Sequence, residues 1–127
     1  MRAASAASDG DKADVRIVYI AEAHASSEWP IGDKVKVDRQ AATVEERTAL
    51  AQRAARELDL EDDFDFLVDP PELDDAFSTT YGAWPIRFFV FDRKEGTLLF
   101  LGQPKDCKYD MEAPFNTVLA ALGAALL

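Results

Sequence analysis

Val15–Trp29, with the sequence VRIVYIAEAHASSEW, decides the fold because it joins an apolar, strand-like segment to a short polar loop. Val15–Ile20 is rich in β-branched residues and almost continuously apolar, a pattern typical of a strand that is covered on both faces. The loop that follows carries Glu22 and His24, and His24 is the single histidine of the chain. In open α/β sheets, ligands bind where strands end and loops begin, so we expect the functional residues here.

Composition and charge describe one soluble, acidic domain. The chain has 127 residues, of which 48% are hydrophobic and 30% are charged, as in ordinary globular proteins. Its net charge of −10 argues against nucleic acid and anionic membranes as partners, because both bind cationic surfaces. The longest apolar run, residues 118–127, is far shorter than the roughly 20 residues that cross a bilayer. A single cysteine, Cys107, excludes an internal disulfide and a CxxC pair, so we expect a reduced, cytoplasmic location.

Local signals predict an alternating α/β domain over residues 15–127. Residues 1–14 are interpreted as a flexible leader or as the remnant of a first helix, since alanine favours a helix and the Ser/Asp/Gly mixture favours disorder. After the first strand, the predicted elements are a short extended piece at Lys34–Val37, a helix from Thr43 to about Leu58, a strand at Phe64–Val68, a short helix at Glu72–Tyr81, hairpin strands at Ile86–Phe91 and Thr97–Leu101, and a closing helix that runs to Leu127.

The first helix has the clearest local signals. Thr43 followed by Glu46 makes a capping box at its start. Apolar positions then recur at helical period and predict the face that packs on the sheet. This stripe consists of Val44, Arg47, Leu50, Ala51, Ala54, Ala55 and Leu58.

The order of elements predicts an α/β, thioredoxin-like fold. It would be a mixed four-stranded sheet with flanking helices, without the first strand and most of the first helix of that fold. A proline directly before the first hairpin strand fits the same fold, which makes Trp84–Pro85 a candidate for a cis peptide bond. The missing elements would expose a sheet edge and an apolar face. Such surfaces favour association, so a homodimer is among the expected partners.

Glu22 and His24 are a candidate acid–imidazole pair. In extended backbone, residues two apart point the same way, roughly 6–7 Å from each other. A carboxylate at that distance favours the imidazolium and orients the ring, as a proton donor requires. The alternative is that His24 is a surface or capping residue at the end of a strand.

Arg87 and Trp29 are the candidate ligand contacts, and each has a structural alternative. Arg87 could offer its guanidinium to a substrate carboxylate, or it could face solvent or pair with Asp69 or Asp92. Trp29 could stack against an aromatic ligand, although large aromatic residues more often belong to the core. No metal site is expected, because the acidic run at residues 59–63 has neither the alternation nor the glycine of a calcium loop.

Two segments resemble a known family. Tyr19–Trp29, Y-I-A-E-A-H-A-S-S-E-W, is similar to the iodothyronine deiodinase segment that reads roughly Y-I-E-E-A-H-x-S-D-x-W. The similarity continues through Gln40 and V-E-E-R at Val44–Arg47. It returns at Tyr81–Val90, Y-G-A-W-P-I-R-F-F-V, and it spans most of residues 15–105. Deiodinases are thioredoxin-fold selenoenzymes that remove iodide from thyroid hormones and are then reduced by a thiol donor.

The resemblance implies roles for four residues. Glu22 and His24 would handle protons and hold the substrate phenol, and Arg87 would clamp the other end of the thyronine. Tyr19 would belong to the supporting hydrogen-bond network. The chain would then be an oxidoreductase with a small iodinated aromatic substrate, a thiol reductant and no bound cofactor.

The departures from the family pattern concern the redox residue and two supporting groups. The family has a selenocysteine or cysteine upstream of the strand that begins here at Val15, whereas residues 1–14 contain no cysteine. Ala21 stands at a family glutamate, and Ala41 stands at a family histidine. A UGA selenocysteine codon read as a stop would explain the loss, and we then expect an in-frame UGA upstream of Met1. A membrane anchor encoded there stays an open alternative.

Three functional hypotheses follow. The first is a deiodinase-like protein whose redox residue is missing, so that the chain alone is inactive. The second is a non-catalytic, thioredoxin-like binding module for a small aromatic acid or a protein partner. The third is a different redoxin that uses Cys107.

Overall fold

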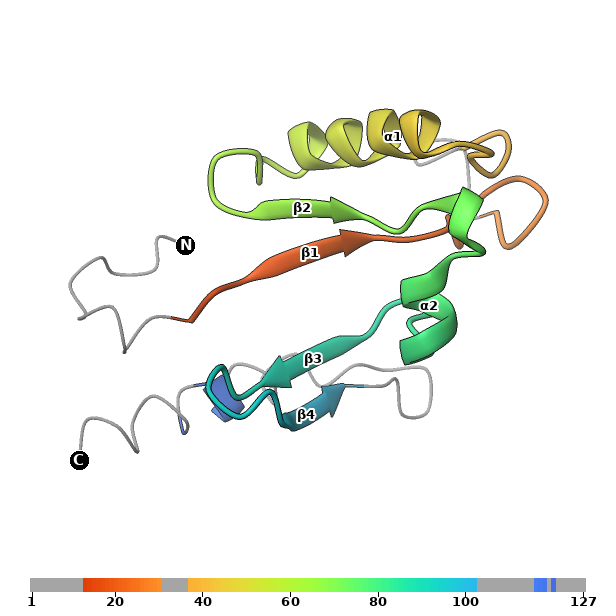
Figure 1. The fold of residues 1–127 in the computed structure, drawn as a ribbon. Coiled ribbons are helices and arrows are strands. Elements are labelled where there is room, and N and C mark those ends of the chain that lie inside the picture. The colour runs from red at the N-terminus through yellow and green to blue at the C-terminus, as the bar shows by residue number, and fades with distance from the viewer. Residues whose placement is uncertain (1–12, 31–36, 103–115, 119, 121–127) are drawn as a thin grey trace. The chain divides into compact units, whose positions relative to one another are not determined.

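The computed structural model describes residues 13–30, 37–102, 116–118 and 120 (Figure 1). The chain divides into two compact units, Val15–Pro85 and a second unit of residues 1–14 and 86–127. Of the predicted extended piece at Lys34–Val37, only Val37 lies within the described residues, and Cys107 lies outside them.

The first unit is built on two parallel strands, β1 (Arg16–Tyr19) and β2 (Asp65–Val68), joined through helix α1 (Val44–Glu57). Parallel neighbours need such a crossover because the chain must return to the start of the sheet before it can run in the same direction. Figure 1 shows α1 running alongside β2. The two predicted strands and the predicted helix are therefore confirmed as one β–α–β unit.

Helix α1 begins at the predicted capping box. Thr43 Oγ1 accepts a hydrogen bond from the Glu46 N–H at 3.2 Å, and the Glu46 carboxylate accepts one from the Ala42 N–H at 2.8 Å. The helix ends at its C-cap, Leu58. The prediction that Leu58 belongs to the packed stripe is wrong, because its side chain is 64% exposed. The chain already leaves the helix there and turns through Asp59, which has a φ of 55°.

The predicted helix at Glu72–Tyr81 is two shorter elements. A 3₁₀ turn, η1 (Pro71–Leu73), comes first, and helix α2 (Ala76–Tyr81) follows. Between them, Asp74 and Asp75 have φ angles of 53° and 50°. This left-handed region costs most side chains energy, and aspartate is among the residues that tolerate it best. The two positions break the helix that the sequence pattern suggested.

Buried Arg47 joins three elements of this unit. Its Nη1 donates a hydrogen bond to the Asp69 carbonyl oxygen at 2.7 Å and forms an ion pair with Asp75. The Asp69 carboxylate accepts hydrogen bonds from the N–H groups of Phe77 and Ser78 at 2.9 and 2.8 Å, which would otherwise lack partners at the start of α2. Arg47 and Asp69 are only 2% and 1% exposed, and charges can be buried to this degree because they are paired. Arg47 thus lies on the buried face of α1 as the stripe predicted, but as an ion-pair donor.

The second unit contains the predicted antiparallel hairpin, with strands β3 (Phe88–Phe91) and β4 (Leu98–Gly102). The turn between them is closed by Asp92, whose carboxylate accepts hydrogen bonds from the N–H groups of Lys94 and Glu95 at 2.9 and 2.7 Å. An aspartate that accepts hydrogen bonds from the backbone of its own turn is a common turn residue, and the strand pairing shifts by a bulge between Val90 and Phe91. The hairpin is confirmed.

The structure shows only part of the predicted four-stranded architecture. Among the described residues, the strands pair two by two, β1 with β2 and β3 with β4, so a single four-stranded sheet stays a prediction. The chain is a mixed α/β protein. The Trp84–Pro85 peptide bond is cis, and residues 116–118 and 120 are helical, within the range predicted for the closing helix.

Replacing Arg47 with alanine is expected to lower the free energy of unfolding by about 3 kcal/mol, the loss typical of breaking a buried ion pair from one side. Urea denaturation of the full chain measures it. Arg53→Ala is the matched control on the same helix, because Arg53 forms an exposed ion pair with Glu57 at 2.8 Å, and such pairs contribute little. Equal losses in the two variants would contradict the role given to Arg47.

Candidate functional site

The loop after β1 is closed by backbone hydrogen bonds. The Trp29 N–H donates to the Ala23 carbonyl oxygen at 3.1 Å, and the Glu28 N–H donates to the Ala25 carbonyl oxygen at 2.8 Å. Ala25 is fully buried and forms an isolated parallel bridge with Val37. The loop therefore has a defined shape, in which Glu22 and His24 occupy fixed backbone positions.

Glu22 is held at its main chain by the side chain of Gln40. The Glu22 N–H donates to Gln40 Oε1 at 2.9 Å, and Gln40 Nε2 donates to the Glu22 carbonyl oxygen at 2.7 Å. Both residues are half-buried. No role for Gln40 is predicted from the sequence, because nothing around it indicates a partner 18 residues away.

The Glu22 carboxyl group lies in a partly desolvated position next to positive charge. Burial raises its pKa above the ordinary value of 4.5, while the charge of His24, followed by those of Arg53 and Arg47, acts in the opposite direction. Burial is the larger effect, so the protonated form is favoured more than in water. The charge of His24 therefore acts on the Glu22 carboxyl group, although Ala23 and His24 lie in a turn and not in the extended backbone that the prediction assumed.

His24 is oriented by its neighbour in the loop. His24 Nδ1 lies 2.8 Å from the Trp29 carbonyl oxygen. A carbonyl oxygen only accepts hydrogen bonds, so this contact assigns a proton to Nδ1. In the neutral ring, Nε2 is then the unprotonated nitrogen, and in the imidazolium form Nε2 carries the second proton. Proton exchange with a ligand would therefore take place at Nε2.

Trp29 presents its ring to the surface of the unit. The side chain is 64% exposed, and its ring centroid lies 5.6 Å from that of His24, with the planes tilted by 54°. The alternative that Trp29 is a core residue is wrong. The carbonyl group of this residue holds the imidazole, and its indole lies beside the same imidazole.

Tyr19 is the last residue of β1 and is half-buried. Its carbonyl oxygen accepts a hydrogen bond from the Asp69 N–H at 2.9 Å, which ties the end of β1 to the junction made by Arg47. The role implied for its side chain stays a prediction.

Arg87 lies directly before β3 and is half-buried. Among the described residues, its guanidinium makes one hydrogen bond, from Nη1 to the Ile86 carbonyl oxygen at 2.7 Å. The Asp92 carboxylate binds the N–H groups of Lys94 and Glu95, and the described residues show no ion pair between it and Arg87. Asp69 belongs to the first unit, so its pairing with Arg87 stays a prediction. Arg87 belongs to the second unit, and its convergence with His24 stays a prediction.

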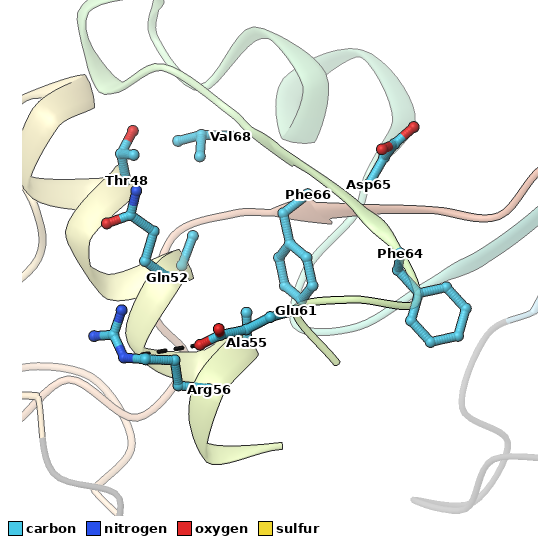
Figure 2. Close-up of a pocket in the computed structure, with 10 residues that line it drawn as sticks. Thr48, Gln52, Ala55, Arg56, Glu61, Phe64, Asp65, Phe66 and Val68 are labelled. Atoms are coloured by element: carbon cyan, nitrogen blue, oxygen red, sulfur yellow. Dashed lines mark ion pairs between the residues drawn. The ribbon is translucent and has the colours of Figure 1, made fainter. Parts of the chain in front are cut away.

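A concave region lies between α1 and β2 and has a volume of about 590 Å³ (Figure 2). Its lining comes from one face of α1 and from the β2 segment, and Arg56 and Glu61 pair across it at 3.9 Å. The lining residues are Thr48, Ala51, Gln52, Ala55, Arg56, Glu61, Phe64, Asp65, Phe66 and Val68. Neither Glu22 nor His24 borders this groove, and the groove contains no histidine or cysteine with which to carry out redox or proton chemistry.

Within the described part of the chain, no group of three or more His, Cys, Asp or Glu side chains is arranged to hold a metal ion. No described helix has the length and apolar character that a membrane span requires.

The comparisons with known proteins give one match. A family model described as Iodothyronine deiodinase matches residues 8–120. No curated protein and no solved structure matches the chain. The matched range contains the whole loop after β1, Gln40 and Arg87.

The raised pKa of Glu22 predicts a pH-dependent gain in stability for Glu22→Gln. Between pH 4.5 and the higher pKa of the folded chain, the folded state binds more protons than the unfolded state, so Glu22 lowers stability as the pH rises. The variant should be more stable than the parent at pH 7, and this advantage should vanish as the pH falls below 4.5. Urea denaturation at several pH values measures the difference.

Glu46→Gln is the control variant, because its effect on stability is expected to change with pH in the opposite direction. A hydrogen bond from Arg39, followed by one from the Ala42 N–H, lowers the pKa of Glu46 to about 2. Glu46 therefore stabilises the fold above pH 4.5, and this contribution is lost as the pH falls toward 2. Parallel pH dependences for the two variants would contradict the assignment of Glu22.

Proposed function

Because this chain belongs to the iodothyronine deiodinase family, we propose that it provides the substrate-binding and proton-handling part of a deiodinase-type site for iodinated, thyronine-like phenols. The observation that carries the proposal is the His24 imidazole, held at Nδ1 by the Trp29 carbonyl oxygen and placed beside the half-buried Glu22. The single thioredoxin-like sheet of four strands is part of the same proposal.

The chemistry requires a soft nucleophile and an acid. In reductive deiodination, the nucleophile takes iodine as a positive equivalent, and the electron pair of the broken carbon–iodine bond stays on the ring carbon. That carbon must then receive a proton. His24 Nε2 is the proposed donor, because Nδ1 is already engaged and a positioned imidazolium is an effective general acid. The protonated form of Glu22, which its raised pKa favours, is the proposed source of a replacement proton.

Two further side chains are the proposed substrate contacts. The exposed indole of Trp29 lies next to the imidazole and offers an apolar face to the iodinated ring. Arg87 has no ion-pair partner among the described residues, and its planar guanidinium suits a carboxylate at the other end of the substrate. This assignment requires the two units to bring Arg87 and His24 to one cleft.

The redox step requires a group other than the four residues proposed above, Glu22, His24, Trp29 and Arg87. Family membership implies a thiol reductant, and the resemblance places a selenocysteine or cysteine upstream of β1, where residues 1–14 have neither. Ala41, which stands at a family histidine, is buried and supplies no proton. We therefore propose that the 127-residue chain binds the phenol but does not turn it over.

Binding of two probes tests the substrate assignment. 3,5-Diiodotyrosine acylated at its amine carries a carboxylate, and 2,6-diiodophenol does not. Both should shift the NMR signals of His24, which are unambiguous because the chain has one histidine. Arg87→Gln should weaken binding of the carboxylate probe about tenfold, the loss of one charge-assisted hydrogen bond, and should leave the phenol unaffected. Arg93→Gln, which changes an exposed arginine of the same unit, is the control. Equal effects of Arg87→Gln on both probes would reject the clamp.

An assay for iodide release in the presence of dithiothreitol tests the proposal that the chain binds the phenol without turning it over. The parent chain should release no iodide above the rate without protein, and Cys107→Ser should behave identically. Release by the parent would overturn the proposal, and release that depends on Cys107 would favour the redoxin hypothesis.

The second candidate function is a binding module without redox chemistry. It is favoured by the absence of cysteine from residues 1–106 and by alanine at two family positions, Ala21 and Ala41. The two candidates differ in whether the chain gains turnover when the upstream redox residue is supplied. A version extended by the upstream codons and containing that residue should release iodide only under the first candidate.

A further inference from the structure

We propose that Gln40 is the positioning residue of the site, and that it holds the main chain of Glu22 in the way a neighbouring β-strand would. The link to proton transfer rests on the function proposed above, whereas the positioning itself stands on geometry. One carboxamide group bonds both the N–H and the carbonyl oxygen of the same residue, at 2.9 and 2.7 Å. In a β-ladder, one strand supplies this same donor and acceptor to the next.

A side-chain amide suits this pair of bonds at neutral pH, because it carries a donor and an acceptor on separate atoms. The carbonyl oxygen accepts from the Glu22 N–H, and the NH₂ group donates to the Glu22 carbonyl oxygen. An ionised carboxylate could accept but not donate, and an apolar side chain could do neither. Glu22 lies beyond the end of β1, where ladder bonds stop, so its half-buried polar groups need another partner.

Gln40 is itself anchored to the start of α1. Arg39 donates two hydrogen bonds to the Glu46 carboxylate, at 3.1 and 2.6 Å, and the Glu46 carboxylate also receives the Ala42 N–H. The residues on both sides of Gln40 are thus tied to the first turn of the helix. The amide is presented to Glu22 from a fixed base, so the helix that packs on the sheet also positions the catalytic loop.

The loop is consequently held at two points that lie two residues apart. Gln40 fixes Glu22 through its main chain, and the Trp29 carbonyl fixes His24 through Nδ1. The charge contact between Glu22 and His24 depends on both. Without Gln40, the Glu22 main chain would turn toward water, and its carboxyl group would leave the partly buried position that raises its pKa.

Gln40→Met tests this inference, because methionine keeps the length and volume of the side chain and removes both hydrogen bonds. Hydrogen exchange of the Glu22 amide should become at least tenfold faster. The pKa of the Glu22 carboxyl, followed by its ¹³C signal, should fall toward 4.5. The charges that act on this carboxyl are His24, Arg53 and Arg47, and none is changed. Gln52→Met, an exposed glutamine on α1, is the control for loss of an amide.

Gln40→Glu is expected to restore the two hydrogen bonds to Glu22 only at low pH. Its protonated carboxyl can both donate and accept, whereas the ionised form can only accept. The protection of the Glu22 amide, corrected for intrinsic exchange, should therefore recover at low pH in Gln40→Glu and not in Gln40→Met. A Glu22 amide and carboxyl that are unchanged in Gln40→Met would overturn the inference.

Probe binding separates this result from the proposed function. With the parent chain, 2,6-diiodophenol should shift the His24 signals, and the shift should be smaller in Gln40→Met. Altered exchange at Glu22 with no phenol binding by the parent chain would keep the positioning role and reject the function. Phenol binding by the parent with unchanged exchange in the variant would do the reverse.

Discussion

The buried guanidinium of Arg47 is the contact on which the first unit depends. It binds the Asp69 carbonyl group and Asp75, and Asp69 in turn binds the carbonyl oxygen of Tyr19 at the end of β1. One side chain of α1 therefore fixes the carboxyl ends of both strands and the start of α2. The loop with Glu22 and His24 leaves the sheet at this junction. The buried apolar residues around it are all alanines, so directional polar contacts, more than large side chains, define the geometry in the described part of this unit.

Features coded by neighbouring residues were predictable. The start of α1 follows from Thr43 and Glu46, and the hairpin follows from two apolar runs separated by a short polar turn. The break between η1 and α2 was not predictable, because its two left-handed residues are aspartates, and aspartate is also common at helix starts. The exposed position of Leu58 was missed for a related reason, since the helical period continues in the sequence beyond the point where the chain leaves the helix.

In the candidate site, too, some features could be predicted from neighbouring residues and others could not. The electrostatic effect of His24 on Glu22 agrees with their closeness in sequence, but the extended backbone assumed for the pair is wrong, because Ala23 and His24 lie in a turn. The contact that holds Glu22 joins residues 18 apart and involves the main chain of one partner, so no pattern of side chains could reveal it. The orientation of His24 was hidden for the same reason, because its partner is a carbonyl group and not the indole of Trp29. For Arg87, the sequence offered Asp92 as an acidic partner within the same unit, and the Asp92 carboxylate binds backbone amides of its own turn.

The double use of Trp29 separates two properties that active sites usually couple. The tautomer of the imidazole is set by a carbonyl group, which every amino acid possesses, while the outward-facing ring at the same position is free to differ. Replacement at this one codon could therefore change which ring systems are accepted without altering the acid that serves them. Under the proposed function, a site built in this way would shift from one halogenated aromatic compound to another by single steps, with its proposed proton donor intact at each of them.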